Sequence, residues 1–223
     1  DQLRGALKDE RRIIRRFCSE VIFYLTGQRG FFNSEVAFVS NGSGNKEIFS
    51  AEYDGRNPAQ FTQTRNITLS PDWSSDGQWL AYTAYAKNNP NLYVKHRRQQ
   101  RGVEIGFEGL NITPAWLPEA SSASDLEEKR LAATLSFEGD QEIYLLTGKG
   151  KIIKRLTANW GSDVSPTWSP DGKKLAFVSN RTGSPQVHVL DVASGQTQRL
   201  TYEGRYNTQP SWSPRGDKIA YAG

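Results

Sequence analysis

The side chains most often used in catalysis are few in this sequence, which has two histidines and one cysteine among its 223 residues. His96 lies in the basic run KHRRQQR, and no nucleophile or carboxylate stands near it in a recognised catalytic spacing. Serine-hydrolase elbows of the type GxSxG, zinc motifs of the type HExxH and glycine-rich phosphate loops do not occur in the sequence. We therefore predict that the protein is not an enzyme.

The other candidate catalytic residues have simpler structural interpretations. Asp76 and Asp171 each belong to a short turn, SSDG or SPDG, in which aspartate is favoured for its local hydrogen bonds. His188 occupies a position that is aromatic in three similar segments, where the residues are Phe49, Tyr93 and Tyr144. We interpret His188 as a packing residue and both aspartates as turn residues.

Short polar side chains recur at fixed distances before four prolines, Pro71, Pro114, Pro166 and Pro210. Three residues before each proline stand Thr68, Asn111, Asp163 and Asn207, directly before each stand Ser70, Thr113, Ser165 and Gln209, and Thr208 precedes the last proline by two. Such a ring is suited to hydrogen-bonding a partner loop or a cation, and these residue types are equally suited to capping their own loops. We predict a partner-binding site from them, together with Asn180 and Arg181 on the same face.

These positions belong to a repeat that runs through most of the chain. Four copies align on a tryptophan: SPDWSSDGQWLAYTA, TPAWLPE with RLAATLS, SPTWSPDGKKLAFVS and QPSWSPRGDKIAYAG. The tryptophans are Trp73, Trp116, Trp168 and Trp212, at spacings of 43, 52 and 44 residues. The longest spacing contains an insertion, residues 119–129, at a place where the other copies have a four-residue turn.

Each complete copy contains four short apolar runs bounded by turn residues, which is typical of an all-β fold. Four strands in about 40–45 residues are the signature of one β-propeller blade. The recurring tryptophan then packs between blades, and binding specificity is expected in the loops that lead into the tryptophan strands. The chain stops after the second strand of a blade, so we expect the sequence to be part of a larger propeller.

A helix is expected before the repeat. An apolar stripe with helical spacing is formed by Leu3, Leu7, Ile14, Phe17, Val21 and Leu25. Gly27 is a stop signal after Thr26. We therefore divide the chain into residues 1–26, the last helix of an upstream domain, and residues 27–223, an incomplete propeller. The alternative is a basic helix that lies on a membrane surface.

The charge is mildly basic, with a formal net charge of +4 and an isoelectric point near 9.1. Much of the excess lies in two runs, residues 11–16 and 95–101. We interpret these as a solvated helix face and a basic loop, and predict no nucleic-acid partner. No apolar run reaches the length of a membrane-spanning helix, so direct membrane insertion is not expected.

The blade pattern SPxWSPDGxxLAFxS, with a later Leu-Thr, resembles the TolB-type propeller family of the periplasmic Tol–Pal envelope system. Residues 19–40, SEVIFYLTGQRGFFNSEVAFVS, resemble the segment that joins the small N-terminal α/β domain of that family to its first blade. The resemblance covers essentially the whole chain. It departs at the insertion 119–129, at the missing upstream domain and at the early end.

The resemblance implies an all-β propeller of four-stranded blades, with about four of an expected six present, preceded by one amphipathic α-helix from an upstream α/β domain. It also implies a non-enzymatic periplasmic protein that docks the peptidoglycan-associated lipoprotein, contacts other Tol proteins and supports outer-membrane integrity and envelope transport. No cofactor is predicted, although the resemblance allows calcium in the central channel. The alternatives are the substrate-gating propeller of a prolyl-oligopeptidase-type peptidase and an interaction propeller of another envelope complex.

Overall fold

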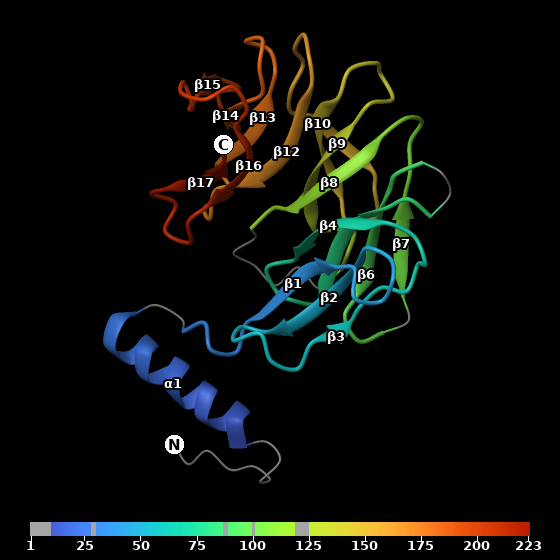
Figure 1. Cartoon of the computed structure of the whole chain (residues 1–223). Coiled ribbons are helices and arrows are strands. Elements are labelled where there is room, and N and C mark those ends of the chain that lie inside the picture. Colours follow the sequence, from blue (N-terminus) through green and yellow to red (C-terminus); the bar gives the residue numbers. More distant parts are fainter. Residues whose placement is uncertain (1–9, 28–29, 87–88, 100, 119–124) are drawn as a thin grey trace.

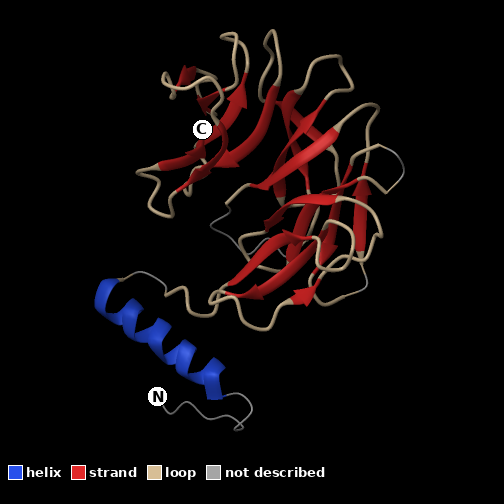
Figure 2. Cartoon of the chain, in the orientation of Figure 1, coloured by secondary structure: helices blue, strands red, loops and turns tan. Residues whose placement is uncertain are grey.

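The structure is a computed structural model that describes residues 10–27, 30–86, 89–99, 101–118 and 125–223. In these described ranges one helix is followed by seventeen strands in five antiparallel sheets, which are arranged side by side around a common centre (Figures 1 and 2). Each sheet is formed by strands that follow one another in the sequence, as in the blades of a propeller. The predicted all-β propeller is therefore confirmed.

Three of the blades have four strands in chain order. Blade two is β4 (Thr68–Trp73), β5 (Trp79–Ala84), β6 (Asn91–His96) and β7 (Gly102–Ile105). Blade three is β8 (Asn111–Trp116), β9 (Arg130–Leu135), β10 (Glu142–Thr147) and β11 (Ile152–Arg155). Blade four is β12 (Asp163–Trp168), β13 (Lys174–Ser179), β14 (Gln186–Asp191) and β15 (Thr197–Arg199).

Two further sheets flank these blades. Blade one is β1 (Glu35–Ser40), β2 (Glu47–Glu52) and β3 (Ala59–Gln60), and blade five is β16 (Thr208–Trp212) and β17 (Ile219–Ala222). The first strand of blade one, EVAFVS, corresponds in sequence to the second strand of the other blades, LAFVS. The tryptophan strands β4, β8, β12 and β16 are neighbours at the inner side of their blades, as their mutual contacts show.

The hydrophobic core lies between successive blades, and the repeat residues supply it. One cluster joins blades two and three, with Trp79, Val94, Trp116 and Leu131 all buried. A second cluster joins blades three and four around Trp168 and Phe177. Burial of side chains this large, at about 25 cal/mol for each Å² of apolar surface, makes every blade depend on its neighbour. The interpretation of the repeated tryptophan as a packing residue is thus confirmed.

The turn that follows each tryptophan strand is closed by its own side chains. In blade four the Ser169 hydroxyl donates to Asp171 Oδ1 at 2.6 Å and accepts from the Lys174 amide at 2.9 Å. Gly172 has a φ of +68°, a left-handed conformation that glycine adopts without a Cβ clash. Ser74 and Asp76 repeat this arrangement in blade two. The local sequence therefore sets the hairpin between the first two strands of a blade.

Two tryptophans also connect neighbouring blades through their indole nitrogens. Trp168 Nε1 donates to the Ala115 carbonyl at 3.1 Å, and Trp212 Nε1 donates to the Thr167 carbonyl at 3.2 Å. The buried Nε1 of Trp116 has no acceptor among the described residues. The junction between blades two and three therefore lacks a bond that the next two junctions have.

Replacing Trp168 with phenylalanine should cost about 1 kcal/mol more in the free energy of unfolding than the same change at Trp116. Both changes remove a similar ring area, but only the first breaks a buried hydrogen bond. Urea denaturation of the two variants measures the difference. Equal losses would show that the indole bond contributes nothing to the blade junction.

Helix α1 (Glu10–Thr26) precedes blade one and ends as predicted at Thr26; the expected helical residues 1–9 lie outside the described residues. The helix buries none of its residues, and Ile14, Phe17 and Leu25 of the apolar stripe are exposed. Contact with blade one is made instead by Arg15, which pairs with Glu52 at 2.5 Å and Asp54 at 2.9 Å. Arg15 was expected on the solvated face, so this docking contact corrects the sequence interpretation.

The insertion in blade three reaches back onto blade two. Residues 119–124 lie outside the described residues, but the part from Asp125 onward is placed. Leu126 is buried in the core between the two blades, and the Lys129 ammonium lies 3.0 Å from Asp76 Oδ2. Within the described ranges, no helix has the length and apolar character needed to cross a membrane.

Candidate functional site

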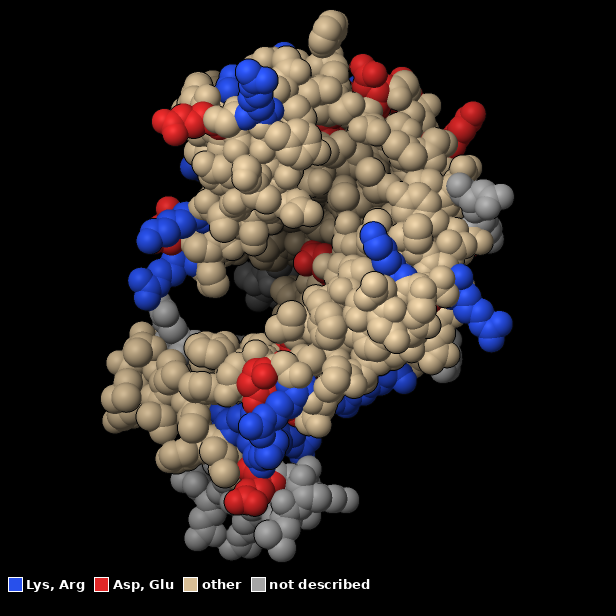
Figure 3. Space-filling view, viewed as in Figure 1, with Lys and Arg blue, Asp and Glu red and all other residues tan. Residues whose placement is uncertain are grey.

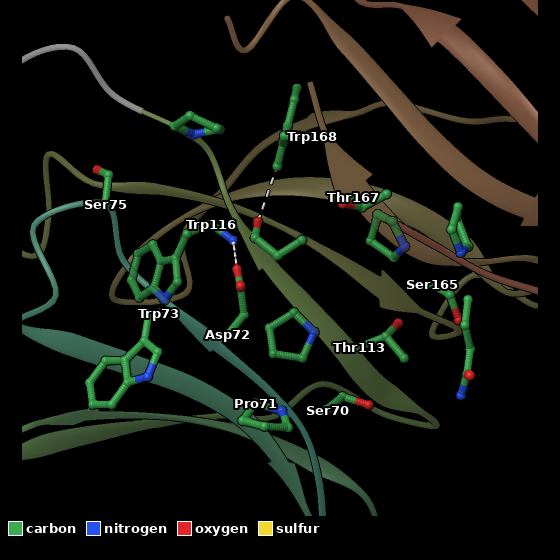
Figure 4. A pocket seen from close by; sticks show the side chains of 16 residues that line it. Ser70, Pro71, Asp72, Trp73, Ser75, Thr113, Trp116, Ser165, Thr167 and Trp168 are labelled. Carbon is green, nitrogen blue, oxygen red and sulfur yellow. Dashed lines mark hydrogen bonds between the residues drawn. The ribbon is translucent and has the colours of Figure 1, made fainter. Parts of the chain in front are cut away.

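The tryptophan strands surround a pocket of about 440 Å³ at the centre of the blades. Sixteen residues line it, drawn from β4, β8, β12 and β16 and the turns that follow the first two (Figure 4). In the space-filling view the molecule is hollowed at this place, and the wall of the hollow is mostly uncharged (Figure 3). The structure therefore brings residues from four blades to one concave surface.

The residues directly before the four prolines all line this pocket, and their role in binding a partner stays a prediction. They have left-handed backbones, with φ values of 53° at Ser70, 51° at Thr113, 56° at Ser165 and 51° at Gln209. Each lies at a β-bulge, where the pairing of the tryptophan strand with its neighbour shifts. Bulges re-aim side chains, and left-handed residues other than glycine cost on the order of 1 kcal/mol. Four repeated strained residues around one pocket favour a functional interpretation.

The side chains of this ring differ in whether they already form hydrogen bonds within the protein. The Thr113 hydroxyl lies 2.9 Å from the Thr134 hydroxyl, so it is partly used inside blade three. Within the described part of the chain, the hydroxyls of Ser70 and Ser165 and the amide of Gln209 form no hydrogen bond. These three groups are therefore free to bond a molecule in the pocket.

The residues three before each proline are buried, with at most 2% of their surface exposed. Their polar atoms hold the loops: Asn111 Nδ2 donates to the Phe107 carbonyl at 2.8 Å, and Asn207 Nδ2 donates to the Glu203 carbonyl at 2.7 Å. Thr68 Oγ1 donates to the Lys46 carbonyl at 3.0 Å. Their side chains match the capping alternative of the sequence analysis. Thr208 is half-buried and is not among the pocket residues.

The fourth residue of this set, Asp163, is bonded to the predicted loop residues of blade four. Arg181 Nη2 donates to Asp163 Oδ2 at 2.6 Å, and Asn180 Oδ1 accepts from the Ser162 amide at 2.8 Å. The loops before β12 and after β13 are thereby joined on one face. Asn180 and Arg181 were predicted on this face, and the structure places them there. Both are engaged in holding the loop that contains Trp160.

Exposed aromatic residues on these loops were missed by the sequence analysis. The Trp160 side chain is 83% exposed, although Asn159 and Ser162 on either side have their amides bonded to Glu142 and Asn180. Tyr202 and Tyr206, in the loop before β16, are also exposed. Large aromatic residues on fixed loops are common at the centres of protein interfaces. Trp160 and Tyr206 do not recur at the same place in the other copies of the repeat, and this difference was the signal that could have identified them.

One charged residue faces the pocket, Asp72, and sequence reasoning also missed it. Its carboxylate accepts a hydrogen bond from the Trp116 amide of the next blade at 2.6 Å (Figure 4). Burial raises the pKa of Asp72 to about 6, and the amides of Trp116 and Trp73 oppose the shift. The corresponding residues of the other blades are Ala115, Thr167 and Ser211. A departure from the repeat at this register is the signal that could have found it.

The comparisons with known proteins agree with this geometry. Residues 23–223 match the family model described as the TolB beta propeller domain, PD40. The chain belongs to this family. A relative from Desulfosudis oleivorans, a Tol-Pal system protein TolB, is 57% identical over 71% of this chain and 34% of its own length. The TolB-type propeller described here thus spans about a third of that curated relative.

Solved structures give the same fold. The crystal structure of TolB from Acinetobacter baumannii has a TM-score of 0.80 and 29% identity, over 98% of this chain and 54% of that chain. A Mycobacterium tuberculosis puromycin-hydrolyzing peptidase has a TM-score of 0.59 and 16% identity, over 81% of this chain and 30% of its own. The second likeness shows the fold alone and gives no support to the peptidase alternative.

The pocket of the TolB-type propeller does not fit a calcium ion well. Calcium takes six to eight oxygen ligands and usually several carboxylates, whereas Asp72 is the one carboxylate among the lining residues. One of its oxygens already accepts the Trp116 amide. Among the described residues no group of three or more histidine, cysteine, aspartate and glutamate side chains could hold a metal. The calcium suggested by the resemblance stays a prediction.

Proposed function

We propose that this TolB-type propeller is a periplasmic, non-enzymatic docking protein that binds the peptidoglycan-associated lipoprotein of the Tol–Pal system. Binding takes place at the central pocket lined by the tryptophan strands β4, β8, β12 and β16. Through this contact and others with Tol proteins, it supports outer-membrane integrity, cell division and transport across the envelope. No nucleic acid and no membrane insertion are part of this function.

The observation that carries the proposal is the pocket ringed by Ser70, Ser165 and Gln209. Their polar groups form no hydrogen bond within the described residues, and their strained backbones are repeated in successive blades. Because the backbone at these residues is already fixed, binding a partner costs little backbone entropy, which favours affinity. The relative named a Tol-Pal system protein TolB supports the choice of partner.

Binding of the soluble domain of the lipoprotein to the full-length protein, measured by calorimetry, tests the proposal. The double change Ser165→Ala and Gln209→Ala removes two pocket groups, and each hydrogen bond contributes about 0.5–1.5 kcal/mol. We expect the dissociation constant to rise about tenfold, with thermal stability unchanged because neither side chain is bonded internally.

The matched control is Thr208→Ala, one residue before Gln209 and outside the pocket. It should leave the dissociation constant unchanged. A loss of affinity in this variant would show that Thr208 belongs to the binding site, as the sequence analysis predicted. Absence of any binding by the wild-type protein would contradict the proposed function itself.

A further inference from the structure

His96 is the last residue of β6 and is buried, with 8% of its surface exposed. Its ring lies edge-on to Trp79, with ring centres 4.9 Å apart. His96 Nδ1 accepts hydrogen bonds from two backbone amides, those of Arg98 at 3.2 Å and Gln99 at 3.1 Å. The His96 amide also donates to the Arg101 carbonyl. One imidazole nitrogen thus caps the turn between β6 and β7.

The corresponding position caps this turn in blades three and four, but with groups that do not change charge near pH 6. In blade four Asp191 Oδ1 accepts from the Ser194 amide at 2.9 Å, and in blade three Thr147 Oγ1 accepts from the Lys151 amide at 3.1 Å. Both residues pair with the first residue of the preceding strand, as His96 pairs with Trp79. Blade two is therefore distinguished by a cap whose acceptor is lost when it binds a proton.

A proton on Nδ1 would face two N–H donors, so the capped turn and the charged ring exclude each other. The surroundings also disfavour the charge: burial and the nearby Arg101 lower the pKa of His96, with only Asp76 opposing them. Asp76 is itself paired with a buried ammonium. The charged groups around the ring are Arg97, Arg98 and Arg101 of its own hairpin, Asp76 of the β4–β5 turn and Lys129 from the segment before β9.

The turn that His96 caps connects blade two to blade one and to the pocket wall. Arg97 Nη2 donates to Glu35 Oε1 of β1 at 2.5 Å, and the Arg97 amide donates to the Gln78 carbonyl. The Arg97 guanidinium also lies 5.5 Å from the ring centre of Trp73, which lines the pocket. Opening of this turn would therefore detach a contact between two blades.

We propose that His96 is a proton-operated latch: protonation of Nδ1 expels the amides of Arg98 and Gln99, opens the turn between β6 and β7 and releases the Arg97 contact with blade one. The closed turn contains neutral His96 with its proton on Nε2. The open turn accepts a proton with an ordinary histidine affinity, so acid shifts the equilibrium toward it. This latch is independent of the identity of any partner.

Hydrogen exchange by NMR on the full-length protein tests the latch. Protection factors of the Arg98 and Gln99 amides, corrected for the intrinsic pH dependence of exchange, should fall about tenfold for each pH unit below about 6.5. The Ser194 amide, capped by Asp191, should keep its protection between pH 7.5 and 5. Imidazole ¹⁵N shifts should show the Nε2–H form of His96 at pH 7.5.

The variant His96→Asn provides the second arm, because asparagine Oδ1 accepts hydrogen bonds near the place of Nδ1 and does not titrate. Its Arg98 and Gln99 amides should show no extra loss of protection in acid. The proposal is overturned if the wild-type amides lose no more protection than Ser194, or if His96 has its proton on Nδ1 at pH 7.5. The wild-type comparison remains decisive if the variant fails to fold.

Discussion

Replacing Asp76 with alanine is expected to lower the free energy of unfolding by about 3–5 kcal/mol, because it leaves a buried ammonium without its counter-ion. The Lys129 side chain is 3% exposed, and its Nζ lies 3.0 Å from Asp76 Oδ2. The aspartate belongs to the β4–β5 turn of blade two, whereas the lysine comes from the inserted segment of blade three. The pair therefore joins two blades, with the ammonium buried and the carboxylate 30% exposed.

Asp171→Ala is the matched control for this experiment. Asp171 has the same place in the corresponding turn of blade four and the same bonds, from the Ser169 hydroxyl and the Lys173 amide. No ion pair with a lysine is formed by Asp171 among the described residues. Urea denaturation should therefore show a loss of only about 1 kcal/mol for this variant, the usual contribution of a turn hydrogen bond.

The double variant Asp76→Ala with Lys129→Met separates the charge from the turn. Methionine fills a similar volume and needs no counter-ion, so most of the lost stability should return. Equal losses for Asp76→Ala and Asp171→Ala would contradict the assigned role of the buried pair.

Asp72→Asn is expected to raise the free energy of unfolding at pH 7.5 by about 1–3 kcal/mol, since each unit of pKa shift corresponds to 1.36 kcal/mol. Burial raises the pKa of Asp72 to about 6 from 3.8. The folded state therefore binds the proton more tightly, and this contribution is present below pH 3.8 and lost as the pH rises through 6. Asparagine keeps an oxygen for the Trp116 amide and never ionises.

The measurement is the free energy of unfolding of both proteins at pH 4 and pH 7.5. The advantage of the variant should be large at pH 7.5 and nearly absent at pH 4. Asp171→Asn should show little change between these two pH values, because hydrogen bonds from Ser169 and the Lys173 amide lower the pKa of Asp171, so that its contribution is lost only as the pH falls below 3.8. If the free energy of unfolding had the same pH dependence in the wild type and in Asp72→Asn, the Asp72 carboxylate would be fully hydrated in the pocket.

A residue that destabilises the fold at neutral pH and faces a pocket is a candidate for binding. Asp72→Asn should therefore be included in the affinity measurements with the lipoprotein.

The blades could be predicted from sequence because their signals are local and repeated. Ser-Pro-Asp-Gly sets a turn within four residues, and a tryptophan at each repeat reports a buried face. The polar ring was harder, because asparagine, aspartate and threonine have the same chemistry whether they cap a loop or bind a partner. The structure divides the set by burial: Asn111 and Asp163 support the loops, while Ser165 and Gln209 reach the pocket.

The contacts made by residues that depart from the repeat could not be predicted from it. Asp72 has its unusual pKa because a neighbouring blade closes over it, which no spacing in the sequence reports. Arg15 falls on the polar side of its helix and yet makes the docking contact, because its partners, Glu52 and Asp54, are distant in the chain. Pairings between residues far apart depend on tertiary packing rather than on local propensity.

Helix α1 is attached to blade one by contacts that should let the two change their relative orientation. Its contacts with blade one include the Arg15 ion pairs and the stacking of that guanidinium 5.1 Å from the ring centre of Tyr53, and no residue of α1 is buried. These ion pairs are partly exposed, with 15% of the Arg15 side chain and 29% of each partner side chain accessible, so salt weakens them by screening. We therefore expect the angle between the helix and the propeller to respond to ionic strength more than the packing of the blades, which share hydrophobic cores.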